Sequence, residues 1–266
     1  MPPDEHYIED TNLSHAWGRA LRLVTRRGVE EVVPLIVSVT GFDTSGRPEE
    51  DPPIRNALDA VLRAAGKFEC ETVANTIFPE ALWNPDHDRA RLFQRYERIR
   101  SRVRRASRQN ARGRYFDRLV TGGPEGRENQ IEFALSAYTA RSGVRRSILQ
   151  FAVFDPHKDH SNAAQLGFPC LQHVTVAPTA AGLALNGFYA TQYMVERAYG
   201  NYLGLCRLGR FLAHELGTKL VRMTCFTGIA ERDMSKREIA PVVAAIDGAL
   251  ADQDTDIEGE ATHEPE

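Results

Sequence analysis

The sequence predicts an α+β fold in which a large mixed sheet is backed by helices on one face. Short β-branched or alternating runs, typical of strands, occur at 32–41, 145–156, 170–178, 182–196 and 218–228. Helical patterns lie between them without a regular strand–helix alternation. This mixed order favours one large sheet with a helical layer over a doubly wound parallel fold.

The N-terminal half begins with an acidic, polar stretch, residues 1–12, which we expect to be a flexible arm. Residues 32–41 predict a buried strand that ends at Gly41. Residues 54–68 predict a helix, because four aliphatic side chains recur on one helical face and Gly66 suits the C-terminal stop. These four side chains are Ile54, Leu58, Val61 and Leu62.

An arginine-rich segment follows, with twelve arginines and no lysine between Arg89 and Arg118. One interpretation is a helix whose arginine stems cover apolar surface while their charged ends stay in water. The other is anion binding, because guanidinium groups suit phosphates. Nucleic-acid binding is the less favoured form of the second interpretation, since the whole chain is not basic.

The C-terminal half contains the remaining elements. A helix at 130–144 precedes the strand led by Arg145 and Arg146, and Pro156 ends that strand. Residues 201–217 predict a helix with Asn201 as N-cap and Gly217 just past its end. The last predicted helix, 235–251, requires a kink or restart at Pro241.

The chain ends in residues 252–266, which are acidic and predict a disordered tail. We therefore expect one domain over 13–251, between the arm and this tail.

Bulk composition limits the classes of protein. The 266 residues are 42% hydrophobic, with a formal net charge of −3, so the core is sizeable and no global charge recruits nucleic acid or membrane. No apolar run of about 18 residues is present, and the N-terminus does not resemble a secretory signal. Four widely spaced cysteines suggest free thiols and a cytoplasmic location.

Few side chains stand out for chemistry. Cys170, in "GFPCLQHV", is either a reactive nucleophile or a small apolar residue. The "HKDH" stretch at 157–160 has metal-capable side chains, but a polar loop is the simpler interpretation because no second ligand cluster is evident. His173 is interpreted as a buried structural histidine, and we expect no metal site.

Four stretches together resemble the thymidylate synthase family. "RRSILQFAVFDP" resembles its arginine pair and following strand, and "FPCLQHVTV" resembles its Pro-Cys-His strand. "FYATQYMVERAYGN" and "YLGLCRLGRFLAHELG" resemble the phosphate-binding segment and the long hydrophobic helix. The spacing from Cys170 to Asn201 matches the family without a gap. The resemblance covers about residues 128–233.

The resemblance implies roles for particular residues. Cys170 is implied as the nucleophile that attacks C6 of a pyrimidine. Arg145 and Arg146 are implied to reach the phosphate of a nucleotide bound to the partner subunit of a homodimer, although a surface or dimer salt bridge is the alternative. Thr191 takes the place of a phosphate-binding serine. Asn201 is implied to bind the uracil ring, the alternative being its N-cap role.

The N-terminal half aligns only loosely with the family. There, Glu71 is the uncertain counterpart of the glutamate that handles ring protons. Trp83 is the candidate ring-stacking residue, for substrate or for 5,10-methylenetetrahydrofolate. Tyr193 stands at a folate-related aspartate position.

Several family residues are replaced. Leu171 stands where the family has the histidine after the nucleophile, and Ala190 replaces the arginine that contacts both phosphate and cysteine. The places of the His-x-Tyr sugar contacts fall near Gly228 and Ala230. These departures put ordinary thymidylate synthesis in doubt and leave the acceptor open.

The sequence thus carries three hypotheses, of which the third is nucleic-acid binding through the arginine-rich segment 89–118. The first is a transferase that adds a methyl or hydroxymethyl unit to C5 of a pyrimidine nucleotide or nucleoside through Cys170, with methylenetetrahydrofolate as donor. The second is a catalytically degenerate homodimer of the same fold, acting as a nucleotide-binding or partner-binding module.

Overall fold

The computed structural model describes residues 6–106, 114–121, 129–160 and 169–261. Within them a seven-stranded sheet has the order β1-β3-β7-β6-β5-β4, and β2 pairs with β7. Pairs β1–β3 and β6–β7 are parallel, whereas the other pairs are antiparallel. The strands are β1 Tyr7–Asp10, β2 Glu31–Val32, β3 Leu35–Val39, β4 Gln150–Ala152, β5 Leu171–Pro178, β6 Leu183–Tyr193 and β7 Leu220–Glu231.

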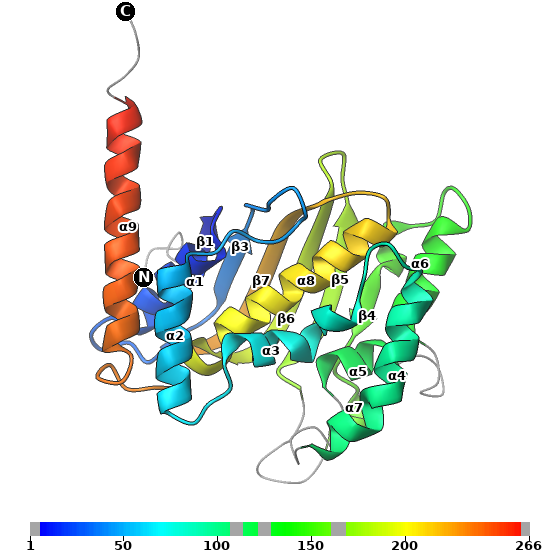
Figure 1. Cartoon of the computed structure of the whole chain (residues 1–266), viewed down its shortest axis with the longest axis horizontal. Helices are drawn as coiled ribbons and strands as arrows, with labels where there is room; N and C mark the ends of the chain where they lie inside the picture. Colours follow the sequence, from blue (N-terminus) through cyan, green and yellow to red (C-terminus); the bar gives the residue numbers. More distant parts are fainter. Residues whose placement is uncertain (1–5, 107–113, 122–128, 161–168, 262–266) are drawn as a thin grey trace, which may run out of the picture.

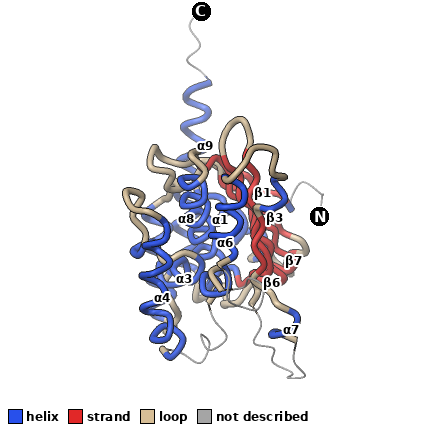
Figure 2. The backbone as a smooth tube through the Cα atoms, turned by 90° about the vertical axis from the view of Figure 1, so that its right-hand side faces the viewer, coloured by secondary structure: helices blue, strands red, loops and turns tan. Residues whose placement is uncertain are grey.

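Helices cover one face of this sheet, as Figures 1 and 2 show, and the predicted α+β class with a mixed sheet backed by helices is confirmed. The α-helices are α1 Leu13–Val24, α2 Pro52–Ala64, α3 Cys70–Ile77, α4 Arg89–Arg105, α5 Tyr115–Leu119, α6 Gln130–Thr139, α7 Pro156–Asp159, α8 Tyr199–Glu215 and α9 Ala240–Ala261. Shorter turns are the 3₁₀ segments η2 Glu80–Leu82 and η5 Arg146–Ile148 and the π-helix η6 Met194–Ala198.

Helix α8 lies across the sheet at the centre of the core (Figure 1), and all but a few of its residues are buried. Two of its glycines allow α3 to pack closely on it. A Cβ atom at Gly200 would lie 2.7 Å from the carbonyl oxygen of Cys70, and one at Gly204 would lie 2.8 Å from that of Ala74. Any larger side chain at these positions would force the two helices apart.

Local patterns correctly predicted several elements. The four aliphatic side chains of α2 are all buried, and Gly66 has a φ of 67° just past the end of this helix. In β5, Val174 and Val176 alternate with less buried neighbours, as expected for a strand with one face on the core.

The N-terminal arm is one difference from the prediction. Tyr7–Asp10 form β1, which pairs in parallel with β3, and Asn12 caps α1 by accepting from the backbone N–H groups of Ser14 and His15. The short segment "YIED" has little strand pattern of its own. It forms a strand because its backbone groups hydrogen-bond with the edge of β3.

The C-terminal region differs as well. Helix α9 continues to Ala261, into the segment expected to be a tail. Pro241 is the second residue of α9, where no intrahelical N–H bond is lost, so neither a kink nor a restart is required.

Candidate functional site

Cys170 lies immediately before β5 and is the exposed cysteine of the chain; Cys70, Cys206 and Cys225 are buried free thiols. Its carbonyl oxygen accepts a hydrogen bond of 3.0 Å from the N–H of Ala190 on β6. The backbone of Cys170 and of Leu171 also hydrogen-bonds the phenol of Tyr115 on α5. The sheet and α5 therefore fix the backbone at this cysteine, while its side chain remains accessible.

The sulfur of Cys170 has two charged neighbours with opposing effects. Desolvation by surrounding atoms raises the pKa of the thiol, Arg197 lowers it, and Glu231 raises it further. The net direction is upward, so the thiol is protonated near neutral pH. Arg197 comes from the π-helix η6, and its guanidinium also lies 5.7 Å from the centre of the Phe68 ring.

A group of tyrosines lies behind Cys170. The rings of Tyr115 and Tyr189 meet edge-on at 6.4 Å, and Tyr189 interacts electrostatically with both Cys170 and Tyr202. Burial raises the pKa of Tyr115 to about 12, so its phenol is neutral and acts through hydrogen bonds.

Two hydroxyls in this region, those of Tyr189 and Tyr202, are buried and have no hydrogen-bond partner among the described residues. The amide of Gln192 lies beside them and hydrogen-bonds the thiol of Cys225. Its Oε1 accepts a hydrogen bond of 3.0 Å from Thr227. Buried polar groups are normally paired, so unpaired ones commonly mark a place for water or a ligand.

The paired arginines lie at the far edge of the sheet. Arg145 and Arg146 are exposed and precede β4, the outermost strand. Arg146 donates to the carbonyl oxygen of Pro178 at 3.0 Å. The carbonyl oxygen of Arg145 accepts a hydrogen bond of 3.1 Å from the N–H of Ile148, whereas its side chain makes no hydrogen bond or ion pair with the described part of the chain. No contact joins either arginine to Cys170 of the same subunit.

Thr191 and Asn201 occupy different environments. Thr191 is half-buried on β6 opposite Ile229 of β7. Asn201 is buried, with 3% exposure, in the first turn of α8. The N-cap interpretation of Asn201 is wrong, because the π-helix η6 leads directly into α8 and moves the start of the helical segment upstream.

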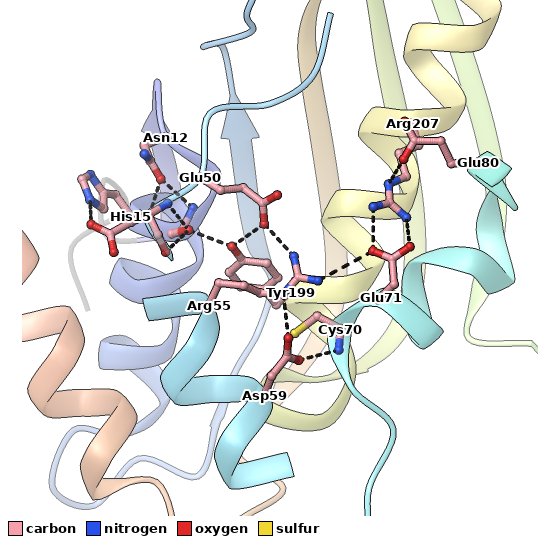
Figure 3. A network of polar contacts seen from close by, with 12 residues as sticks. Asn12, His15, Glu50, Arg55, Asp59, Cys70, Glu71, Glu80, Tyr199 and Arg207 are labelled. Carbon is pink, nitrogen blue, oxygen red and sulfur yellow. Dashed lines mark hydrogen bonds and ion pairs between the residues drawn. The ribbon is translucent and has the colours of Figure 1, made fainter. Parts of the chain in front are cut away.

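Glu71 belongs to a network of ion pairs among α2, α3 and α8, shown in Figure 3. Arg207 donates to both of its carboxylate oxygens, at 2.8 and 2.7 Å, and these hydrogen bonds lower the pKa of Glu71. Arg207 and Arg210 in turn pair with Glu80. A carboxylate held ionised by a bidentate arginine is poorly suited to carry protons to and from a ring.

The other half of this network surrounds Arg55, whose guanidinium contacts Glu50 at 2.7 Å and Asp59 at 3.0 Å. The hydroxyl of Tyr199 donates to Glu50 at 2.7 Å. Asp59 accepts from the N–H of Cys70 at 2.8 Å, which ties α3 to α2 (Figure 3). These groups are paired with one another and act as a structural clamp.

Trp83 packs within the helical layer. Its ring meets Phe211 and His214 of α8 edge-on, each at 5.6 Å, and the Arg210 guanidinium lies 5.0 Å from the ring centre. Tyr202, which marks the Cys170 end of α8, is twelve residues before His214, or roughly 18 Å along the helix. The structure therefore does not bring Trp83 to Cys170.

Tyr193, by contrast, lies at the end of β6, is 47% exposed, and pairs in register with Glu231, a neighbour of Cys170. The two residues that the resemblance assigns to folate thus belong to opposite ends of α8. They do not form one folate site.

Sequence reasoning missed Tyr115, Tyr189, Arg197 and Glu231 as neighbours of Cys170. Arg197 carried the clearest signal, since it follows the replaced arginine position, Ala190, by seven residues within the same quoted stretch. Tyr115 was hidden in the arginine-rich segment. Gly228 and Ala230 stand near the places of the family's sugar contacts and carry no polar side chain. The nearest acidic residues in the sequence are Glu231 and Asp233.

Among the described residues, no group of three or more His, Cys, Asp or Glu side chains is placed to hold a metal ion. No helix in the same ranges combines the length and apolar character needed to span a bilayer.

Comparison with known proteins identifies the fold of the chain but does not assign it to a family. No family model matches the chain, and no curated protein matches its sequence. Among solved structures, thermostable thymidylate synthase A from Bacillus subtilis is similar to it, with a TM-score of 0.51 and 12% sequence identity. The match covers 89% of this chain and 84% of that one. The chain therefore has a thymidylate-synthase-like fold.

Proposed function

We propose that the chain is a thymidylate-synthase-like transferase that adds a one-carbon unit to C5 of a pyrimidine nucleotide or nucleoside. The observation that supports this most is the exposure of Cys170 at the head of β5 in such a fold, while the other cysteines are buried. Free thiols also fit the expected cytoplasmic location.

The proposed chemistry begins with the Cys170 thiolate. Its sulfur forms a bond to C6 of the pyrimidine, and the π electrons of the C5–C6 bond move to the carbonyl at C4, which gives an enolate. C5 is then nucleophilic and bonds to the one-carbon unit, as a bond from that carbon to its carrier breaks with its electron pair left on the carrier. Loss of the C5 proton then expels the sulfur and restores the ring. Release from the carrier needs water for a hydroxymethyl product, or a hydride from the reduced carrier for a methyl product. Covalent addition of this kind divides one difficult substitution into easier steps.

Arg197 is the residue we propose to help this thiolate form. It is the positive charge that lowers the Cys170 pKa, and it comes from the segment in which Ala190 replaces the expected arginine. Desolvation outweighs Arg197 in the free protein, so the pKa of the Cys170 thiol is raised. An arginine close to the sulfur stabilises the thiolate as the site becomes drier.

A homodimer is part of the proposal, and the open face of the sheet supports it. Helices cover the other face (Figure 2), so the side chains on this one lack intramolecular cover. A row of mainly apolar side chains crosses it in register, with Tyr7, Phe226 and Phe188 each more than a third exposed. The row is Tyr7, Ile36, Phe226, Phe188, His173 and Ala152.

A polar row lies beside the apolar one. Its members pair with each other, as Ser38 does with Thr224 at 2.7 Å and Asn186 with Thr175 at 3.2 Å. Such a face is suited to a two-fold contact with a second copy. In that dimer, we propose that Arg145 reaches a phosphate bound to the partner subunit.

The identity of the one-carbon donor is proposed from the fold alone. When bound, 5,10-methylenetetrahydrofolate supplies an electrophilic one-carbon unit. Since Trp83 and Tyr193 do not form one site, no step is assigned to this donor, and the experiment must identify it.

The proposal is tested by incubating the full chain with a panel of uracil and cytosine nucleotides and nucleosides, with isotopically labelled methylenetetrahydrofolate. We expect label in one pyrimidine product and, with a 5-fluoro analogue of that pyrimidine, a mass increase on Cys170. Cys170→Ser should abolish both, while retaining the thermal unfolding midpoint. Absence of transfer and of adduct across the panel would exclude the transferase.

The second candidate is a binding module of the same fold. The raised Cys170 pKa and the engagement of Glu71 by Arg207 favour it. Calorimetric titration with the same nucleotides separates the two, because the module binds a pyrimidine with equal affinity in wild type and in Cys170→Ser and never transfers label.

A further inference from the structure

The structure divides the arginines of the arginine-rich segment into two sets, of which the first is paired with buried carboxylates. Arg100 and Arg104 contact Asp117 at 2.8 and 2.5 Å, and Arg118 contacts Asp159 at 2.6 Å. Both aspartates are buried. Since Asp159 belongs to the "HKDH" stretch, this stretch holds an arginine in place rather than a metal ion. The paired arginines stabilise the packing around α5 and have no charge left for a ligand.

The second set is a row on one side of α4, whose members are separated by seven, four and three residues and lie within an arc of about 60° around the helix axis. We define the exposed arginine row as Arg91, Arg98, Arg102 and Arg105, all of which are exposed. The side chains of the first three make no hydrogen bond or ion pair within the described chain. Arg105 donates to the carbonyl oxygen of Ser101 and forms no ion pair there.

Helix α4 lies on the outer side of the helical layer, away from the open face of the sheet (Figure 2). Its inner side packs on the core through Leu92 and Tyr96, which are both buried. The exposed arginine row therefore stays accessible if two copies of the chain meet through the open face. A role for this row depends neither on that dimer nor on the proposed transferase.

The charge around the row is positive. Helix α4 carries eight arginines and one acidic residue, Glu97, which pairs with Arg100 at 2.9 Å. The N-cap residue Asp88 precedes Arg91 by one turn, so the uncompensated charge is concentrated at the other three members of the row. Exposed charges more than about 10 Å apart are largely screened at 0.1 M salt, so the net charge of −3 on the whole chain does not cancel this local field.

The length of the row suits a polyanion better than a single small anion. Fourteen residues separate its ends, which gives about 21 Å along the helix. Duplex DNA carries one phosphate charge per about 1.7 Å of its axis, so a row of this length meets several phosphates at once. Guanidinium groups also match phosphate oxygens through paired hydrogen bonds.

The other side chains on the exposed side of α4 distinguish between polyanions. They are alanine, glutamine, glutamate and serine. Single-stranded nucleic acids are normally held by aromatic rings that stack on the bases, and membrane-surface helices insert apolar side chains, but this side of α4 offers neither. The major groove of B-form DNA is about 12 Å wide and admits an α-helix, whereas that of an A-form RNA helix is deep and narrow. Duplex DNA is therefore the partner that fits best.

We propose that α4 is a binding surface for the backbone of duplex DNA. The helix lies along the major groove, and the guanidinium groups of the exposed arginine row contact phosphates at its edges. Phosphate contacts hold a protein on the duplex without reading its sequence, so the binding has no sequence preference. The Cys170 site is not part of this surface.

The test measures fluorescence anisotropy of a labelled DNA duplex of about 20 base pairs, which is longer than the row, as the full chain is added at several salt concentrations. One strand of the duplex and an RNA duplex of the same sequence are the other probes. We expect a Kd of about 10 μM for duplex DNA near 0.1 M salt, and a slope of log K against log salt of about −3. The single strand and the RNA duplex should each bind at least about fivefold more weakly.

The triple variant Arg98→Gln, Arg102→Gln and Arg105→Gln locates the surface. It should weaken binding to duplex DNA at least about tenfold and reduce the salt slope to about −1, since three phosphate contacts are lost. The three side chains form no ion pair within the described chain, so the thermal unfolding midpoint should stay that of wild type.

A second triple variant is the matched control. Arg27→Gln, Lys219→Gln and Arg237→Gln remove the same total charge from exposed positions outside α4 and should change the affinity less than twofold. Cys170→Ser should bind DNA as wild type does, so the DNA-binding proposal and the transferase can fail separately.

Three outcomes would overturn the proposal. The first is no binding of duplex DNA by the folded protein, whether or not it binds vesicles of anionic phospholipid. The second is equal weakening in the two triple variants, which indicates a diffuse charge effect. The third is binding of the single strand or of the RNA duplex at least as tight as that of duplex DNA, which would mean that the groove geometry of B-form DNA is not recognised.

Discussion

Two groups of polar side chains that pack around α8 differ in how they are satisfied. Around Arg207 and Arg210, each charge meets an opposite charge, and Glu71 and Glu80 form ion pairs. Behind Cys170, the buried hydroxyls of Tyr189 and Tyr202 have no partner among the described residues. The charged network stabilises helix packing, whereas the tyrosine group has unused hydrogen-bonding capacity near an exposed thiol. The comparison favours the tyrosine group over the charged network as the place for a ligand.

The largest expected effect concerns thiol accessibility. We expect iodoacetamide to modify Cys170 in the folded protein at least about 100-fold faster than the three buried cysteines, which require local opening. Peptide mass spectrometry over a time course measures this ratio. Comparable modification of Cys206 or Cys225 would contradict the selective accessibility of Cys170.

The second prediction concerns the ion pairs that Arg207 makes with Glu71 and Glu80. Arg207→Ala leaves Glu71 and Glu80 without their shared partner and should lower the free energy of unfolding by about 2 kcal/mol, measured by urea denaturation. The Glu71 pKa is lowered, so this pair stabilises the fold at neutral pH and its contribution is lost as the pH falls through the folded pKa. The difference from wild type should therefore narrow below about pH 4.

Arg63→Ala is the matched control, because it removes an arginine from the exposed pair with Glu69 and should cost much less. An equal loss in the two variants would show that the Arg207 network has no special role.

The third prediction concerns the electrostatics of Cys170. Because its pKa is raised, its alkylation rate should increase about tenfold per pH unit between pH 7 and 8, as the thiolate fraction does. Arg197→Gln removes the charge that lowers this pKa and should slow alkylation several-fold at pH 8. An unchanged alkylation rate in this variant would show that Arg197 does not affect the Cys170 thiol.

The smallest effect is expected at the unpaired hydroxyls. Tyr202→Phe removes a buried O–H that has no described partner, so the free energy of unfolding should stay within about 1 kcal/mol of wild type or rise. Urea denaturation decides this. A loss of more than about 2 kcal/mol would mean that this hydroxyl is hydrogen-bonded and that the tyrosine group is as well satisfied as the charged network.

Elements with a strong local pattern were predictable from the sequence. The aliphatic stripe of α2 and the alternation in β5 depend on nearby residues, and both are confirmed. Strand β1 was missed because its stability comes from pairing with β3, about thirty residues away. The Asn201 cap was wrong because a π-helix precedes α8, and sequence periodicity does not reveal such a junction.

The candidate site was predictable only in part. Cys170 stands out through its flanking motif, and the structure places it at the surface. Glu71 was selected by a loose resemblance, and its bidentate contact with Arg207, 136 residues away, was not visible in the sequence. Arg197 is not apparent from the sequence, because it lies seven residues after Ala190 and approaches Cys170 only through the fold.

Asp233 gives the junction before α8 a further significance. Its carboxylate accepts the N–H groups of Val195 and Glu196, each at 2.8 Å, and so anchors the first π-helical turn from beyond the end of β7. The direction in which the following Arg197 projects is therefore set in part by Asp233, which lies thirty-six residues later in the sequence. The placement of the charged neighbour of the thiol therefore depends on the segment that follows β7.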